Sequence, residues 1–147
     1  FVYNNCDDAT IKAYKEIVTY AESKRVKPEV VFAIAWADTG CGNAMTTPNN
    51  YGNVANNDRG MRYGFMTPLK GWQAIVDTLN NKHMSGLTMI GQLSGGGRKV
   101  LGSKYTCVEA PAPFKCYATS GENHHKNVMR ALVGMGIEAE ATYLIRK

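Results

Sequence analysis

The segment from Pro28 to Asp38 constrains the fold most, because it is apolar on nearly every side. Its apolar run, Val30 to Ala37, is too short to cross a bilayer, which takes about 20 residues. Pro28 suits the first turn of a helix, where its missing N–H would have no partner, and Gly40 suits the end. A helix that is apolar all round is buried, so we predict a central core helix.

Helical spacing of apolar residues recurs along much of the remaining chain. It predicts further helical segments, at 9–23, 68–81, 88–93, 123–134 and 137–145. Asp7 and Asp8 are suited to cap the first of these. Its inward face is expected to carry Ile11, Tyr14, Val18 and Ala21.

The stretch after the core helix is rich in Asn and Gly, residues that tolerate left-handed backbone and favour tight turns. We predict two short strands there, 51–55 and 61–66, joined by a turn at 56–60. At 147 residues the chain fits one domain, 1–147, of the α+β class and mainly α, with a small β-hairpin lobe.

Four cysteines bear on the compartment: Cys6, Cys41, Cys107 and Cys116. They form no Cys-x-x-Cys pair and no zinc-finger spacing with a histidine, so two disulfides are the preferred interpretation. We favour the pairs Cys6–Cys41 and Cys107–Cys116, which predict an oxidising compartment: secreted, extracytoplasmic or virion-associated. Free thiols in a cytosolic protein are the alternative. The chain begins at Phe1 without a basic-then-apolar leader, as expected of a processed protein or a fragment.

The formal net charge of +5 suits an anionic partner such as cell wall, nucleic acid or a virion interior. The Lys and Arg residues are scattered, which argues against specific nucleic-acid binding. No run of apolar residues is long enough for a transmembrane segment. His124 and His125 lack the His-Glu-x-x-His pattern, so we expect no metal and no cofactor.

Asp38 is the main candidate for chemistry because it ends the predicted core helix. Apolar surroundings and the negative end of a helix dipole both raise the pKa of a carboxyl group, as a general acid requires. Asp58, on the predicted turn, is the candidate second carboxylate, and glycoside cleavage commonly uses two carboxyl groups across a cleft. The alternatives are a helix-end carboxylate bound to backbone N–H groups for Asp38, and a turn residue for Asp58.

Four segments, in order along the chain, are similar to one class of enzymes. Residues 35–42 (AWADTGCG) resemble the Ala-x-x-Glu-Ser-Gly-x-Gly motif of bacterial glucosaminidases and lytic transglycosylases. Residues 49–53 (NNYGN) resemble their Asn-Asn-aromatic-Gly segment, and 117–120 (YATS) resemble their Tyr-Ala-Thr motif. Trp72 and the stretch 79–81 (LNN) resemble the middle of phage-borne and cell-surface lysozyme-like proteins.

This resemblance implies a lysozyme-like fold and cleavage of peptidoglycan or a related glycan, either by hydrolysis or by lytic transglycosylation. Asp38 matches the catalytic Glu, but it is one methylene shorter. The resemblance also places Tyr117 near the acid. The residues expected to orient the sugar are Tyr51, Asn50, Asn53, Tyr63 and Tyr117.

The exchange of Glu for Asp motivates a second hypothesis. In it, the chain is a weak or inactive lysozyme-like module that binds cell-wall glycan or has a structural role in a phage or envelope assembly. A misplacement of about 1 Å can cost on the order of 100-fold in rate. An unrelated secreted helical protein is the third possibility.

Overall fold

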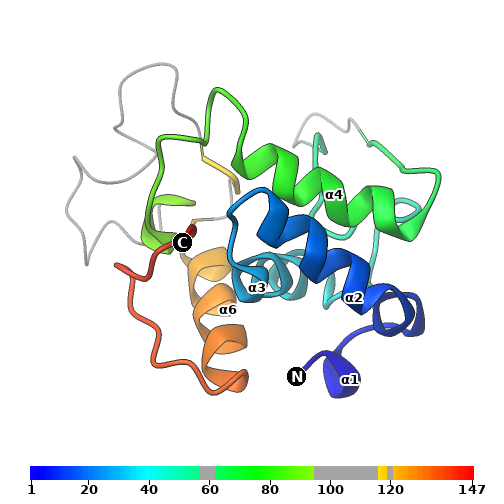
Figure 1. Ribbon diagram of the computed structural model, residues 1–147, viewed down its shortest axis with the longest axis horizontal. Helices are drawn as coiled ribbons and strands as arrows, with labels where there is room; N and C mark the ends of the chain where they lie inside the picture. Colours follow the sequence, from blue (N-terminus) through cyan, green and yellow to red (C-terminus); the bar gives the residue numbers. More distant parts are fainter. Residues whose placement is uncertain (57–61, 95–115, 119–120) are drawn as a thin grey trace.

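The computed structural model describes residues 1–56, 62–94, 116–118 and 121–147. This part of the chain is mainly helical (Figure 1). Its elements are α1 (Val2–Asn5), α2 (Asp8–Ser23), α3 (Pro28–Thr39), α4 (Pro68–Leu79), the 3-10 helix η1 (Ile90–Gln92) and α6 (Gly121–Gly134). The predicted helices at 9–23, 28–38, 68–81 and 123–134 are confirmed, whereas 88–93 contains only the short 3-10 helix.

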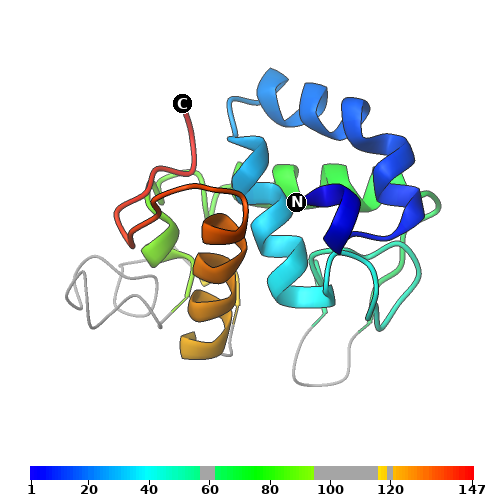
Figure 2. The same ribbon diagram turned by 90° about the horizontal axis from the view of Figure 1, so that it is seen from below.

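Helix α3 is the centre of the fold, as its uniformly apolar sequence predicts. Every residue from Val30 to Ala35 is buried. Helices α2, α4 and α6 all pack against α3, and two views show it lying among them (Figures 1 and 2). Pro28 occupies the first turn of α3, and Gly40 ends it in a left-handed conformation, with φ of 59°.

Side chains cap the flanking helices where their sequences place acceptors. Asp7 accepts a hydrogen bond from the Thr10 backbone N–H and so caps α2. Thr67 accepts one from the Lys70 backbone N–H and caps α4, which has Pro68 in its first turn.

The predicted inward face of α2 is only partly correct. The buried residues of the helix are Thr10, Ile17 and Ala21. Tyr14 is exposed, and it lines a groove of about 930 Å³ together with Ile11 and Val18. The helix is therefore rotated relative to the prediction, because Ile17 packs into the core rather than Tyr14.

The helical turns predicted for 137–145 are wrong. This segment pairs with two distant parts of the chain instead: Ile90 and Gly91 donate backbone hydrogen bonds to Tyr143 and Ala141, and Lys27 donates one to Ile145. Backbone pairing across the chain thus replaces the local bonds of a helix. The resulting antiparallel bridges, Val26 with Arg146 and Met89 with Leu144, are isolated ones.

The predicted hairpin is also absent from the described residues: 51–55 forms turns, and 62–66 carries no strand. Asn53 and Ala55 have positive φ, which interrupts an extended strand. The two segments still contact each other, because Asn50 Nδ2 donates to the Tyr63 carbonyl at 2.8 Å and the Tyr63 N–H donates to Asn56 Oδ1 at 2.7 Å. Side-chain amides therefore replace a backbone ladder.

The predicted disulfide Cys6–Cys41 is confirmed and joins α1 to the residues after α3. Cys116 is also disulfide-bonded, while its predicted partner Cys107 lies outside the described residues. A search of the described part of the chain finds no helix with the length and apolarity needed to cross a membrane.

Candidate active site

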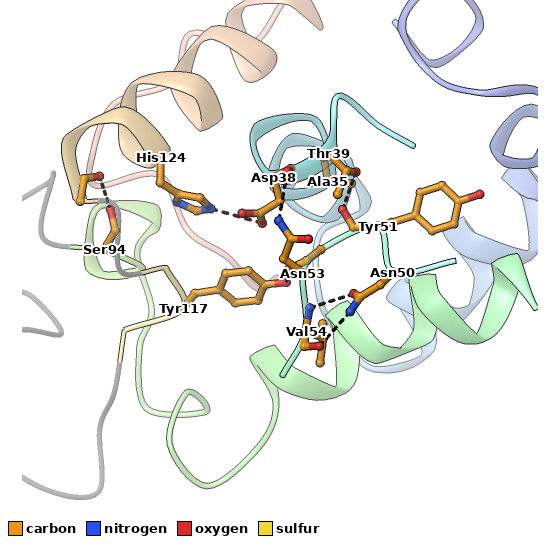
Figure 3. Close-up of polar contacts among 12 residues, drawn as sticks. Ala35, Asp38, Thr39, Asn50, Tyr51, Asn53, Val54, Ser94, Tyr117 and His124 are labelled. Carbon is orange, nitrogen blue, oxygen red and sulfur yellow. Dashed lines mark hydrogen bonds and ion pairs between the residues drawn. The ribbon is translucent and has the colours of Figure 1, made fainter. Parts of the chain in front are cut away.

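Asp38 lies in the last turn of α3, where the central helix reaches the Asn-rich loop (Figure 3). Its side chain is mostly buried, with 13% of its surface exposed. The carboxyl group is therefore held largely in the protein interior but keeps some contact with solvent.

The backbone around Asp38 is fixed by hydrogen bonds from both sides. The hydroxyl of the next residue, Thr39, donates to the carbonyl of Tyr51 at 2.7 Å and accepts from the Gly42 N–H at 3.1 Å. Asn53 Nδ2 donates to the backbone carbonyl of Asp38 at 3.1 Å. Asn53 has φ of 49°, a conformation that asparagine tolerates better than most residues. The loop at 49–53 is thereby tied directly to the end of α3.

An ionisable side chain from α6 faces the carboxyl group of Asp38. His124 Nε2 lies 3.5 Å from Asp38 Oδ2, and the histidine side chain is only 2% exposed. Burial raises the pKa of the Asp38 carboxyl, and the facing imidazole of His124 partly opposes that rise. The net direction is upward, toward a group that stays protonated closer to neutral pH.

Tyr117 completes the cluster. Its hydroxyl donates to the Gly52 carbonyl at 2.8 Å, and its ring stacks on His124 with the centroids 5.9 Å apart. Burial and the negative charge of Asp38 raise the pKa of Tyr117 well above its ordinary value, so the phenol stays neutral. The Tyr117 side chain therefore lies close enough to Asp38 for the aspartate charge to act on it, and its role as a sugar contact stays a prediction.

Two residues expected to contact sugar are instead part of the core. Tyr51 has no exposed surface. Its ring stacks on that of Trp72 with the ring centroids 4.7 Å apart, and its hydroxyl donates a hydrogen bond to Asp7 Oδ2 at 3.0 Å. Its side chain points away from Asp38 (Figure 3). Asn50 is equally buried, and it braces the loop through hydrogen bonds to the backbone of Val54. Neither side chain is placed to bind a glycan, because packing and loop hydrogen bonds occupy both.

The other predicted site residues have different positions. Asn53 is half-buried beside Asp38, as described above. Tyr63 is 54% exposed and packs edge-on against Phe65. Its role as a sugar contact stays a prediction. Asp58, the candidate second carboxylate, lies outside the described residues.

His124 is the functional candidate that the sequence-based prediction missed. The signal was present in the helical period of α6, because the apolar residues Val128 and Ala131, which are buried, lie four and seven residues after His124. Extending that buried face by one helical turn toward the N-terminus of α6 includes His124, which then lies beside Asp38 at the end of α3. Among the described residues, no group of three His, Cys, Asp or Glu side chains could hold a metal ion.

Replacing Asp38 by asparagine is expected to stabilise the fold at neutral pH. A carboxyl with a raised pKa binds its proton more tightly in the folded chain, so the wild type loses stability as pH rises from the ordinary value of 3.8 through the folded pKa. Asparagine has no proton to lose. The Tm of Asp38→Asn should exceed that of the wild type by a few degrees at about pH 7, since 1 kcal/mol corresponds to about 2–4 °C at this size.

Thermal unfolding followed by circular dichroism over a pH series measures this difference. The gain should disappear toward about pH 4, where both carboxyl and amide are neutral. Asp77→Asn is the matched control, because Asp77 is exposed on α4. A Tm difference for Asp38→Asn that is the same at every pH would contradict the raised pKa.

Comparison with protein-family models, with curated proteins and with solved structures finds no significant match to this chain.

Proposed function

We propose that the chain cleaves glycosidic bonds of peptidoglycan and that Asp38 is its general acid. The observation that carries this proposal is the environment of Asp38. Its carboxyl group is largely desolvated, its pKa is raised, and Oδ2 has no hydrogen-bond partner among the described residues. A structural helix-end carboxylate would be expected to bond to nearby backbone N–H groups, whereas the buried Oδ2 of Asp38 faces the imidazole of His124 at 3.5 Å.

The arrangement of the four similar segments supports a lysozyme-like fold. Asn53, from the Asn-Asn-aromatic-Gly segment, binds the backbone of Asp38, and Tyr117, from the Tyr-Ala-Thr segment, binds the backbone of Gly52. Trp72 packs on Tyr51 of the same loop. Three of the four segments, up to 65 residues apart in sequence, therefore meet near Asp38, while Trp72 supports the loop from its other side.

The proposed reaction begins when protonated Asp38 donates its proton to the glycosidic oxygen as the bond from the sugar carbon breaks. Positive charge then develops on the sugar ring. In a hydrolytic route Asp58 would stabilise that charge or activate water, whereas a lytic route needs one carboxyl group. The disulfide Cys6–Cys41 supports an extracytoplasmic, secreted or virion-associated setting, where peptidoglycan is accessible.

A second candidate function is a module that binds glycan, in a phage or envelope assembly, without cutting it. The observation in its favour is that Tyr51 and Asn50 are buried, which removes two of the expected sugar contacts near Asp38. The similar enzymes have Glu where this chain has the shorter Asp38, and this difference also favours a module that binds without cutting.

Incubation with insoluble peptidoglycan separates the two candidates. The enzyme hypothesis predicts that the wild type releases soluble fragments and that Asp38→Asn sediments with the polymer without releasing any. The binding hypothesis predicts that both proteins sediment with the polymer equally and that neither releases fragments. If neither protein sediments or releases fragments, both hypotheses are wrong.

A further inference from the structure

The imidazole of His124 is a buried polar group with a single facing partner. Nε2 lies 3.5 Å from Asp38 Oδ2, and neither ring nitrogen has a hydrogen-bond partner among the described residues. Leaving a buried donor or acceptor unsatisfied costs about 1–3 kcal/mol. An apolar side chain at this position would avoid that cost, so packing alone does not explain a histidine here.

The ring is held in place on two sides. It stacks on Tyr117 with an interplanar angle of 27°, and the Tyr117 hydroxyl is fixed to the Gly52 carbonyl. Its own helix α6 packs against α3 through the face that also carries Val128 and Ala131. The imidazole is thus directed at the carboxyl group of Asp38 from the protein interior, since the aspartate side chain is the more exposed of the two (Figure 3).

We propose that His124 is a positioning residue for Asp38. Its Nε2, 3.5 Å from Oδ2 in this structure, closes to a hydrogen bond that orients Oδ2 and stabilises the carboxylate left after proton donation. This inference rests on the proposed function. In the step concerned, the proton passes from Asp38 to the glycosidic oxygen, and the electron pair of the broken bond goes to that oxygen. His124 keeps its own proton throughout and donates only a hydrogen bond.

The physical need for such a partner follows from the burial of Asp38. Desolvation alone makes a carboxyl group a poor proton donor, because its anion is unfavourable in the interior. A donor at Oδ2 lowers that cost and keeps the acid strength matched to the working pH. Among the described residues, the other titratable groups coupled to the pair are Tyr117, which stays neutral, and His125, whose pKa is lowered first by burial and then by His124.

Two substitutions separate the electrostatic role from packing. His124→Phe keeps a flat ring and removes the donor, while His124→Gln keeps a neutral N–H donor. His125→Gln is the matched control, because it changes the adjacent histidine of the same helix. Carboxyl 13C NMR then follows the titration of Asp38, assigned by the signal that is missing in Asp38→Asn.

In His124→Phe the Asp38 midpoint should move up by about one pH unit, because a nearby opposite charge depresses a carboxyl pKa by about 1–3 units. The high-pH limb of the rate profile for peptidoglycan cleavage should move with it. His124→Gln should lie between Phe and the wild type, and His125→Gln should match the wild type. If His124→Phe fails to fold, the shift in His124→Gln decides the question.

An unmoved Asp38 midpoint overturns the inference, whatever the cleavage rate. If His124→Phe lowers the cleavage rate equally at every pH and the high-pH limb of the rate profile does not move, then His124 contributes packing alone. The NMR titration needs no turnover, so a midpoint that moves in a chain that never cleaves peptidoglycan would support the pairing and overturn the proposed function.

Discussion

Asp38→Asn is expected to reduce fragment release from peptidoglycan by about 10²- to 10⁴-fold, the usual contribution of general acid–base catalysis. The amide is nearly isosteric with the carboxyl group, so the end of α3 and its contacts with Asn53 should persist. It has no acidic proton to give to the leaving oxygen. The loss should therefore appear in kcat, while binding to insoluble peptidoglycan stays close to that of the wild type.

Asp38→Glu provides the complementary test, because it keeps a carboxyl group and extends it by one methylene. We expect it to retain measurable cleavage where Asp38→Asn does not. Asp77→Asn removes the same charge from the exposed face of α4 and should cleave at the wild-type rate. Equal rates for wild type and Asp38→Asn would remove Asp38 from the mechanism.

Gly71→Ala is expected to destabilise the fold by about 3 kcal/mol or more, because it forces a backbone clash that a side-chain rotation cannot relieve. Gly71 lies in α4, where the loop crosses the helix so closely that an added methyl group would overlap the carbonyl oxygen of Asn49. The same methyl group would press on the Tyr51 ring at 3.3 Å. Moving the loop outward would separate Tyr51 from Trp72 and release the segment that contacts Asp38.

The free energy of unfolding from urea titration measures the Gly71 effect, with a Tm lower by about 6–12 °C in a chain of this size. Gly134→Ala is the matched control within a helix. Its added methyl group would meet only the Phe1 ring, at an ordinary distance of 3.5 Å, and alanine favours a helix over glycine by about 1 kcal/mol. Gly134→Ala should therefore be neutral or stabilising. Similar effects from the two substitutions would contradict the close approach at Gly71.

The helical core could be predicted because its determinants are local. The apolar run of α3, its first-turn Pro28, its Gly40 end and the Asp7 cap of α2 all act within a few residues of the elements they define. The same locality placed Asp38 at the end of a buried helix. The pairing of Cys6 with Cys41, one of three possible connectivities, was favoured because it ties the N-terminus to the end of the core helix.

The parts that could not be predicted depend on contacts between distant residues. The segment 137–145 is apolar enough for a helix, but backbone pairing with 88–91 and Lys27 determines its structure. Tyr51 and Asn50 belong to a polar-looking loop, yet packing on Trp72 and hydrogen bonds to Val54 bury them. His124 lies 86 residues after Asp38 in the sequence, and only the packing of α6 against α3 brings the two side chains together.

Mass spectrometry of the products released from purified peptidoglycan tests whether Asp38 is a glycosidic acid. We expect the wild type to release fragments whose glycan strands are cut, with a terminal sugar that is either reducing or one water lighter. Asp38→Asn should release none of them. Fragments with intact glycan strands and cut peptides, equal fragments from both proteins, or none from the wild type would contradict the assignment of Asp38 as a glycosidic acid.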